Sequence, residues 1–272
     1  MIEFVAQKNQ KISLAIKDIS NPISYSLLMK CLRKKDVKIN GKRVSSDQLL
    51  SIGDKVQIYC EQTSVEPVNT LYLDENIIIV DKKSGFTAES VFEYLSKIYA
   101  EIYFLHRLDR NTCGLMVFAF NKVAERELLT AFKKRSIDKI YHALVYGKLQ
   151  KKEQVLSAYL VKDSDNSLVK IYNTMVKNSA PIKTGYKVIK EYENSSLLEV
   201  TLYTGKTHQI RAHLASIGHF IIGDGKYGEN VINKQFNVKS QKLIAKKLTF
   251  HFDGDSALNY LDNKSFISEF NI

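Results

Sequence analysis

The chain has 272 residues, 44% of them hydrophobic and 10% aromatic, which is enough to bury a substantial core. Its aliphatic runs, such as residues 77–80, are far shorter than the roughly 20 apolar residues of a membrane-spanning helix. Residues 1–10 lack the pattern of a signal peptide, so we expect a cytoplasmic protein without a membrane partner. The net charge of +11, from 40 Lys and Arg against 29 Asp and Glu, favours a polyanionic partner such as nucleic acid.

The basic excess is concentrated at the start of the chain. Residues 1–60 carry eleven Lys and Arg and five Asp and Glu, a net charge of 11 − 5 = +6, which indicates a small basic module. Apolar residues recur at helical spacing over residues 23–32, with Ser24 as a candidate N-cap and three basic residues at the carboxyl end. Asn40 and Gly41 lie between two short alternating runs and predict a tight hairpin, and "SIGDKVQIY" predicts a further turn and strand.

The polar segment 61–69 contains one of only three prolines and is typical of a linker, so a larger domain is expected over residues 70–272. Periodicity predicts strands over 71–73, 77–81, 115–120, 140–149, 184–190 and 196–203. It predicts helices over 88–100, after Asn121 as N-cap, and between Thr207 as N-cap and Gly218 just past the helix end. Regular alternation of strands and helices is absent. We therefore expect an α+β fold, with a mixed, mainly antiparallel sheet and flanking helices, behind a small α/β module.

The segment "HRLDRNTCGL", residues 106–115, places Asp109 between two arginines. A carboxylate beside guanidinium groups stays ionised at neutral pH, which suits a nucleophile or a base rather than a general acid. A metal site would need further carboxylates or histidines nearby, and the widely spaced cysteines form no CxxC pair, so no metal is expected. Taken alone, the segment also fits a surface turn with local ion pairs. The glycine-rich "GDGKYG", residues 223–228, lacks the spacing of a phosphate-binding loop.

Three spaced segments favour a functional role of Asp109 over a surface turn. "HRLDRNTCGLMVFA", "DKIYHALVYG" and "VTLYTGKTHQIRAHLASIGHFIIGDGKYG" resemble, in this order, the three signature regions of the RluA family of RNA pseudouridine synthases. The likeness extends over nearly all of residues 70–252. Residues 11–59, with the helix, the basic cluster and the "VKINGKRV" hairpin, resemble the S4-like RNA-binding domain. The two together are the layout of family members that modify large-subunit ribosomal RNA.

The resemblance implies a role for each matching residue. Asp109 corresponds to the nucleophile that attacks the target uridine at the ribose C1′ or the base C6, and Arg211 to the arginine that pairs with this carboxylate. Tyr141 corresponds to the tyrosine that packs on the base and is a candidate for removing the C5 proton. Leu202 corresponds to an apolar residue of the pocket, and Arg107 to the residue that fills the gap left by the flipped nucleotide. Without Asp109, a core tyrosine and a helix-end ion pair would be the simpler interpretations of Tyr141 and Arg211.

Further residues are expected to contact RNA. In the synthase domain they are His106, Lys206 and His208, and in the amino-terminal module they are Arg33, Lys34, Lys35, Lys38 and Lys42. The reaction is an isomerisation, so the resemblance implies no metal and no organic cofactor. We expect RNA as the partner and a monomeric protein.

The chain departs from the family pattern in four places. Cys113 replaces a serine, and its thiol is a weaker hydrogen-bonding group. Lys206 replaces an arginine and loses the bidentate fork. "DKKSGF" lacks the usual proline, and Tyr25 stands where an S4-like domain carries an arginine. None of these changes removes the nucleophile.

These observations predict a pseudouridine synthase acting on RNA, with large-subunit (23S) ribosomal RNA as the expected substrate. Two alternatives remain open at this point. One is a non-catalytic RNA-binding or ribosome-assembly factor on the same scaffold. The other is an RNA glycosylase, which would release free uracil rather than rejoin it.

Overall fold

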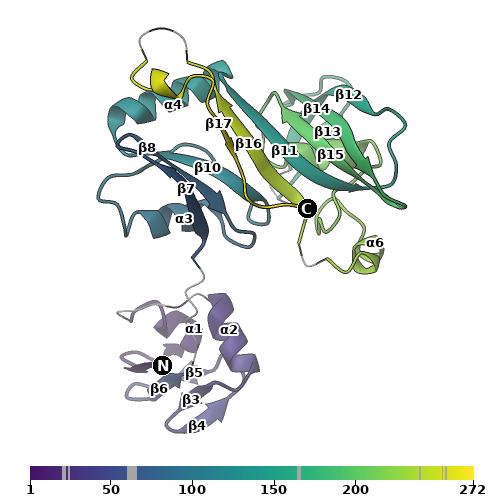
Figure 1. The fold of residues 1–272 in the computed structure, drawn as a ribbon. Coiled ribbons are helices and arrows are strands. Elements are labelled where there is room, and N and C mark those ends of the chain that lie inside the picture. Colours follow the sequence, from purple (N-terminus) through teal and green to yellow (C-terminus); the bar gives the residue numbers. More distant parts are fainter. Residues whose placement is uncertain are drawn as a thin grey trace. The chain divides into compact units, whose positions relative to one another are not determined.

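A computed structural model describes residues 1–19, 23, 25–59, 66–163, 167–238, 240–252, 254 and 256–272. The chain divides into two compact units, Met1–Val65 and Glu66–Ile272 (Figure 1). No helix within the described ranges is long and apolar enough to cross a membrane. The expected N-cap Ser24 and most of the expected linker, residues 61–65, lie outside the described residues.

The first unit is a small antiparallel sheet with two short helices. Its elements are β1 (Ile2–Val5), β2 (Gln10–Lys11), α1 (Ile12–Ala15), α2 (Tyr25–Arg33), β3 (Val37–Ile39), β4 (Lys42–Val44), β5 (Leu49–Leu50) and β6 (Lys55–Ile58). The four-stranded sheet has the order β1-β6-β3-β4, and β2 pairs with β5. Leu28 and Leu32 of α2 are buried in its core. Asn40 and Gly41, both at positive φ (49° and 81°), form the predicted tight turn between β3 and β4.

The second unit is built on one large sheet. Its elements are β7 (Val68–Leu73), β8 (Ile77–Lys82), α3 (Ala88–Leu95), β9 (Tyr103–Phe104), β10 (Cys113–Ala119), α4 (Lys122–Lys134), β11 (Ile137–Tyr146), β12 (Glu153–Asp163), β13 (Leu168–Tyr172), β14 (Ala180–Glu191), β15 (Ser195–Leu202), α5 (Gln209–Ser216), α6 (Asn230–Gln235), β16 (Leu243–Phe250), η1 (Asn259–Leu261) and β17 (Ser265–Ile267). The eleven-stranded sheet has the central order β13-β12-β14-β15-β11-β16-β10-β8-β7. Among the described strands only β10 and β16 pair in parallel, which confirms the expected mainly antiparallel α+β fold.

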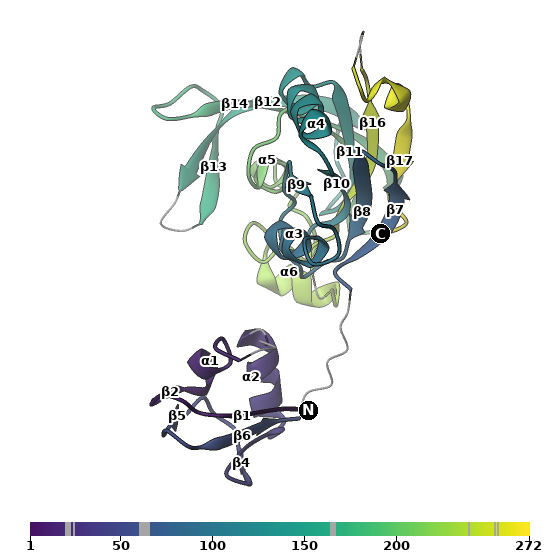
Figure 2. The same cartoon turned by 90° about the vertical axis from the view of Figure 1, so that its left-hand side faces the viewer.

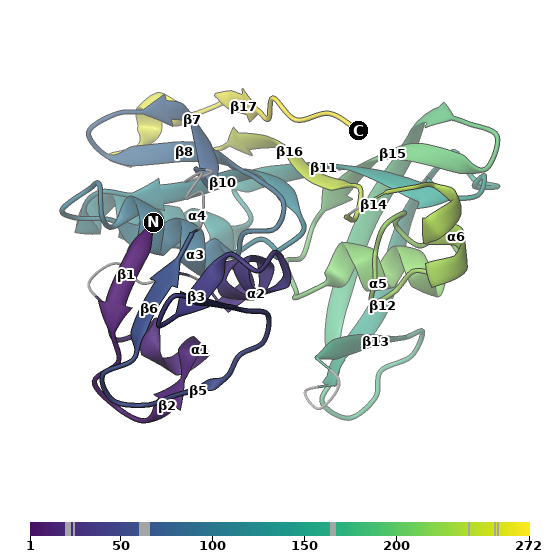
Figure 3. The same ribbon diagram turned by 90° about the horizontal axis from the view of Figure 1, so that it is seen from below.

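Helices cover both faces of this sheet at its β7–β10 end: Figure 1 shows α4 on one side of these strands and α3 on the other, and Figure 3 shows β17 beside β16. Successive side chains of a strand point to opposite faces. On β8, Ile78 and Val80 therefore pack in the cluster that contains α3, whereas Ile77 and Ile79 pack in the cluster that contains α4. Burial on both faces explains why residues 77–80 are continuously apolar.

The start and end of two helices bear directly on the sequence predictions. Asn121 caps α4 as predicted, because its side chain accepts a hydrogen bond from the backbone N–H of Ala124. The helix expected over 88–100 instead ends at Leu95, where turn-type bonds replace the helical pattern and Ile98 is 55% exposed. The sequence did not predict β12 and β13, which form the hairpin that projects at the far end of the sheet in Figure 2.

Candidate active site

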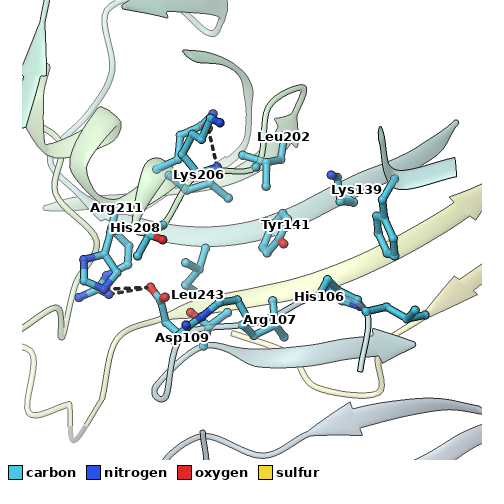
Figure 4. A pocket seen from close by; sticks show the side chains of 18 residues that line it. His106, Arg107, Asp109, Lys139, Tyr141, Leu202, Lys206, His208, Arg211 and Leu243 are labelled. Atoms are coloured by element: carbon cyan, nitrogen blue, oxygen red, sulfur yellow. Dashed lines mark hydrogen bonds and ion pairs between the residues drawn. The ribbon is translucent and has the colours of Figure 1, made fainter. Parts of the chain in front are cut away.

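A cavity of about 370 Å³ opens in the second unit (Figure 4). Its walls come from the 105–112 loop before β10, from β11, from the end of β15, and from the turn that leads into α5. Eight residues predicted as site residues line it: His106, Arg107, Asp109, Tyr141, Leu202, Lys206, His208 and Arg211. The fold thus brings together side chains that lie up to 105 positions apart in the chain (211 − 106).

Contacts with Lys82 and with β16 hold the loop that carries Asp109 in place. The buried ammonium of Lys82 donates hydrogen bonds to three carbonyl oxygens, including that of Arg110 at 3.1 Å. Gly114 has a φ of +110°, and a Cβ there would overlap the carbonyl oxygen of Ala245 on β16. Only glycine therefore lets β10 approach β16 closely enough to pair with it. These contacts fix the backbone that follows Asp109.

Asp109 is paired with Arg211 and not with its neighbours in sequence. Its carboxylate is 18% exposed and accepts a hydrogen bond of 2.7 Å from Nη1 of Arg211. Nη1 of Arg107 instead lies 3.4 Å from Oε1 of Glu89, and its side chain is 61% exposed. Arg107 is therefore available to a ligand, while Arg211 orients Asp109 through a charge-assisted hydrogen bond.

Tyr141 lies on β11 beside a register shift against β16, which occurs between Ile140 and Tyr141. A β-bulge of this kind re-aims side chains. The ring lines the cavity together with Leu202. Burial, and then the charge of Asp109, raise the pKa of Tyr141 well above its ordinary value, so its hydroxyl is neutral at physiological pH.

The two histidines of the site are neutral for the same physical reason. Burial lowers the pKa of His106 to about 3, with Lys139 adding a smaller effect. Its Nε2 accepts the backbone N–H of Val117 at 3.1 Å, so its role is to hold the loop. Burial also lowers the pKa of His208, although Asp109 opposes this with Nε2 3.8 Å from its carboxylate. Neither side chain supplies a positive charge at pH 7.

The helix α5 begins differently from the prediction. His208, at a φ of +55°, is the N-cap residue, and no side chain caps it, so the prediction of Thr207 as the N-cap is wrong. Gln209 instead holds the segment before the helix, because its Oε1 accepts hydrogen bonds from Thr204 Oγ1 and from the backbone N–H of Lys206. This closes the turn and leaves the side chain of Lys206 exposed at the cavity.

The basic residues of the first unit are available to solvent. Arg33, Lys34, Lys35 and Lys42 are exposed, and Lys38 is partly buried, with its ammonium 5.0 Å from the centre of the Tyr59 ring. They occupy the carboxyl end of α2 and the β3–β4 hairpin.

Cys113, in the second unit, is partly buried, and burial first of all raises the pKa of its thiol. Its Sγ lies 3.7 Å from the carbonyl oxygen of Leu243, so the serine-to-cysteine departure keeps a weak hydrogen bond.

Two pocket features escaped the sequence analysis. Asp224 is fully buried and holds the far side of Arg211 through bonds of 2.7 and 2.8 Å. Lys139 lines the cavity on the same face of β11 as Tyr141 and has no ion-pair partner among the residues that the structure describes. Its position two residues before Tyr141 is the signal that could have identified it, because alternate residues of a strand share a face.

Comparisons with known proteins identify the family of this chain. The family model for RNA pseudouridylate synthase matches residues 76–216, just over half of the chain. Ribosomal large subunit pseudouridine synthase C of Vibrio vulnificus is 30% identical over 246 residues, which cover 81% of this chain and 77% of that protein. The protein of the same name from Vibrio parahaemolyticus is 28% identical over 268 residues, covering 89% and 82%.

A solved structure shares the fold. Human RNA pseudouridylate synthase domain containing 1 superimposes with a TM-score of 0.62 at 24% sequence identity, covering 78% of this chain and 94% of the human one. At this identity the likeness concerns the fold alone. The chain therefore belongs to the RNA pseudouridylate synthase family and is an enzyme that isomerises uridine to pseudouridine in RNA.

Proposed function

We propose that this enzyme modifies large-subunit (23S) ribosomal RNA and uses Asp109 as its nucleophile. The observation that carries the proposal is the carboxylate of Asp109 in the cavity, paired with and aligned by Arg211 at 2.7 Å. The choice of RNA is supported by the curated relatives, which are named ribosomal large subunit pseudouridine synthase C.

The size of the cavity supports base flipping. Its volume of about 370 Å³ is that of a small-ligand pocket and cannot hold a duplex. A uridine inside a helix must leave the stack to reach Asp109, at a cost of a few kcal/mol. The exposed guanidinium of Arg107, whose only ion pair among the described residues is with the half-exposed Glu89, is suited to fill the vacated space.

The proposed reaction uses groups of this pocket at each step. The carboxylate of Asp109 attacks the ribose C1′ or the base C6, and the bond between C1′ and N1 breaks. The uracil turns and C5 bonds to C1′, the bond to Asp109 breaks and returns its carboxylate, and C5 loses its proton. Because the hydroxyl of Tyr141 is neutral, it can take up this proton only while passing its own to an acceptor such as the released carboxylate of Asp109.

A phenylalanine at position 141 separates the two roles of this residue. Tyr141→Phe keeps the ring that packs on the base, so we expect RNA affinity to be unchanged. It removes the hydroxyl, so we expect the rate of pseudouridine formation to fall by about 100-fold or more, as for other lost acid–base groups. Single-turnover kinetics with RNA binding measured in parallel would check this. A wild-type rate would leave only the packing role.

The first unit is proposed to be an S4-like RNA-binding domain. Lys34→Gln with Lys35→Gln should weaken RNA binding and lower the slope of log affinity against log salt by about 1.5, because each lost phosphate contact contributes roughly 0.7–0.9. Filter binding across a salt series measures this slope. Lys8→Gln with Lys17→Gln makes the same charge change in the same unit, outside α2 and the hairpin, and should leave the slope unaltered. Equal slopes for the two double variants would refute the assignment.

The proposed substrate is tested with unmodified RNA. The protein is incubated separately with large-subunit ribosomal RNA, small-subunit ribosomal RNA and transfer RNA, and pseudouridine is mapped by carbodiimide-dependent stops of reverse transcriptase. We expect new stops in the large-subunit RNA. Stops confined to transfer RNA would overturn the substrate, and no stops in any RNA would favour a non-catalytic RNA-binding or ribosome-assembly factor.

A further inference from the structure

The glycine-rich loop Gly223–Gly228, for which the sequence suggested no function, lies directly behind Arg211. We propose that Asp224 in this loop is a positioning residue of the reaction. It selects which nitrogen of Arg211 faces Asp109, and it limits how much of the guanidinium charge Asp109 receives. The inference rests on the proposed role of Asp109 as the nucleophile.

The first observation is the geometry of the three side chains. Asp224 is 0% exposed and accepts from Nε of Arg211 at 2.7 Å and from Nη2 at 2.8 Å. These two donors form one edge of the planar guanidinium. The bond to Asp109, at 2.7 Å, comes from Nη1, on the side of the guanidinium away from Nε. The carboxylate of Asp224 therefore sets the plane and the rotation of the group that orients the nucleophile.

The second observation is electrostatic. Burial opposes the charge of Arg211, but hydrogen bonds and charge from Asp224, followed by those from Asp109, raise its pKa further above the ordinary value. Burial likewise opposes the charge of Asp224, yet Arg211 and two backbone N–H groups lower its pKa. Arg211 and Asp224 are thus both charged, and one guanidinium is shared by the two carboxylates of Asp109 and Asp224. Asp109 is oriented without being fully neutralised, which preserves its reactivity as a nucleophile.

The third observation is that the loop is built to hold Asp224 still. Its Oδ1 accepts the backbone N–H groups of Lys226 at 2.9 Å and Tyr227 at 3.2 Å. The side chain of Asn233 accepts from the N–H of Gly223 at 2.7 Å and donates to the carbonyl of Asp224 at 3.1 Å. Gly223 has a φ of +82°, and a Cβ there would overlap the carbonyl of Ser240.

Tyr227 of the same loop ties the cluster to the other side of the pocket. Its ring centre lies 5.2 Å from Cζ of Arg211, and its hydroxyl is 2.9 Å from Nδ1 of His208. The backbone N–H of Val169 donates to the same hydroxyl at 2.8 Å. A cation over an aromatic face is stabilised, so this contact holds the guanidinium from a second direction. The loop as a whole therefore fixes Arg211 rather than binding a phosphate.

Asp224→Asn in the full chain tests this proposal, because it removes the charge and keeps the shape. We expect kcat to fall about 10- to 100-fold, as for other misplaced reacting groups, while KM and RNA affinity stay at wild-type values. We also expect the acid limb of the kcat–pH profile to move to lower pH, because the whole charge of Arg211 then faces a single carboxylate. Unchanged kcat with an unchanged profile would overturn the proposal.

Asp81→Asn is the matched control. Asp81 is also 0% exposed and accepts hydrogen bonds from Ser268 and Glu269, but it does not line the pocket. It should leave kcat and the pH profile as in the wild type. If both variants lose the same activity without a shift of the acid limb, Asp224 has only a structural role, and the proposal is wrong.

Two further measurements keep the proposal testable in every case. If Asp224→Asn does not fold, Asn233→Ala loosens the same loop and keeps the carboxylate, so kcat should fall while RNA affinity does not; wild-type kcat would count against the proposal. If the wild-type protein makes no pseudouridine, the proposed function fails separately. The exchange of the Nε–H of Arg211, followed by nuclear magnetic resonance, still tests the proposal in that case. This hydrogen should be protected from exchange in the wild type and lose this protection in Asp224→Asn. Equal exchange in both proteins would contradict the positioning of Arg211 by Asp224.

Discussion

Asp109→Asn is expected to abolish pseudouridine formation, with a fall in the single-turnover rate of at least about 10,000-fold, as for other removed nucleophiles. The substitution is isosteric, and an amide oxygen can still accept from Arg211, so the fold and the pocket should persist. RNA affinity should therefore equal that of the wild type. Carbodiimide mapping of the product, with a parallel binding isotherm, separates the loss of chemistry from a loss of binding.

The matched control for this prediction is Asp138→Asn. The side chain of Asp138 is 61% exposed and pairs with His251 on the surface of the same unit. This variant should retain full activity, since surface pairs contribute little. If Asp109→Asn kept a rate near that of the wild type, the carboxylate could not be the nucleophile.

Arg211→Met is expected to lower the free energy of unfolding by about 3–5 kcal/mol at pH 7, in addition to its loss of activity. Removal of the guanidinium leaves the carboxylates of Asp109 and Asp224 without their shared counter-ion. Arg110→Met removes an exposed arginine of the neighbouring motif and should change the stability by less than about 0.5 kcal/mol. Urea unfolding followed by circular dichroism compares the two variants with the wild type.

The loss of stability in Arg211→Met should depend on pH in a defined direction. The pKa of Asp224 is lowered in the folded wild type by Arg211, so its stabilising contribution is present above the unfolded value of about 3.9 and is lost as pH falls. Without Arg211, only the two backbone N–H groups of the loop oppose the effect of burial, so this pKa rises and the variant is penalised most at neutral pH. The difference from the wild type should therefore shrink towards pH 4. A difference that grew on acidification would contradict this assignment of charges.

A second substitution distinguishes lost charge balance from lost packing. Arg211→Met combined with Asp224→Asn removes both members of the buried pair and should recover part of the stability that Arg211→Met loses. No recovery would mean that the arginine stabilises the unit through packing alone.

Local signals predicted well the parts of the fold that depend on neighbouring residues. Asn121 caps α4 through a bond to a residue three positions away, and Asn40 with Gly41 forms a turn that needs only two residues at positive φ. The end of α3 depends on distant packing, since Tyr99 leaves the helical path to lie 4.8 Å from the ring of Phe120. The periodicity of residues 88–100 gives no information on a contact with Phe120.

In the site, too, the features that depend on distant contacts could not be predicted from local sequence. The pairing of Asp109 with Arg211 joins residues 102 positions apart, and only the family resemblance indicated it. The sequence did not indicate Asp224, because its contact with Arg211 exists only once the loop of residues 223–228 folds back onto α5. The strand β12 was missed although Leu156, Ala158 and Leu160 alternate correctly, because charged residues surround them and one face alone is buried.

The most direct test of the account follows the fate of the C5 hydrogen. Large-subunit ribosomal RNA labelled with tritium at C5 of uridine is incubated with the wild type and with Asp109→Asn, and tritium release, pseudouridine and free uracil are counted together. We expect the wild type to release one tritium for each pseudouridine formed, with no free uracil, and Asp109→Asn to release none. Free uracil in place of pseudouridine, or tritium release that survives in Asp109→Asn, would contradict the account.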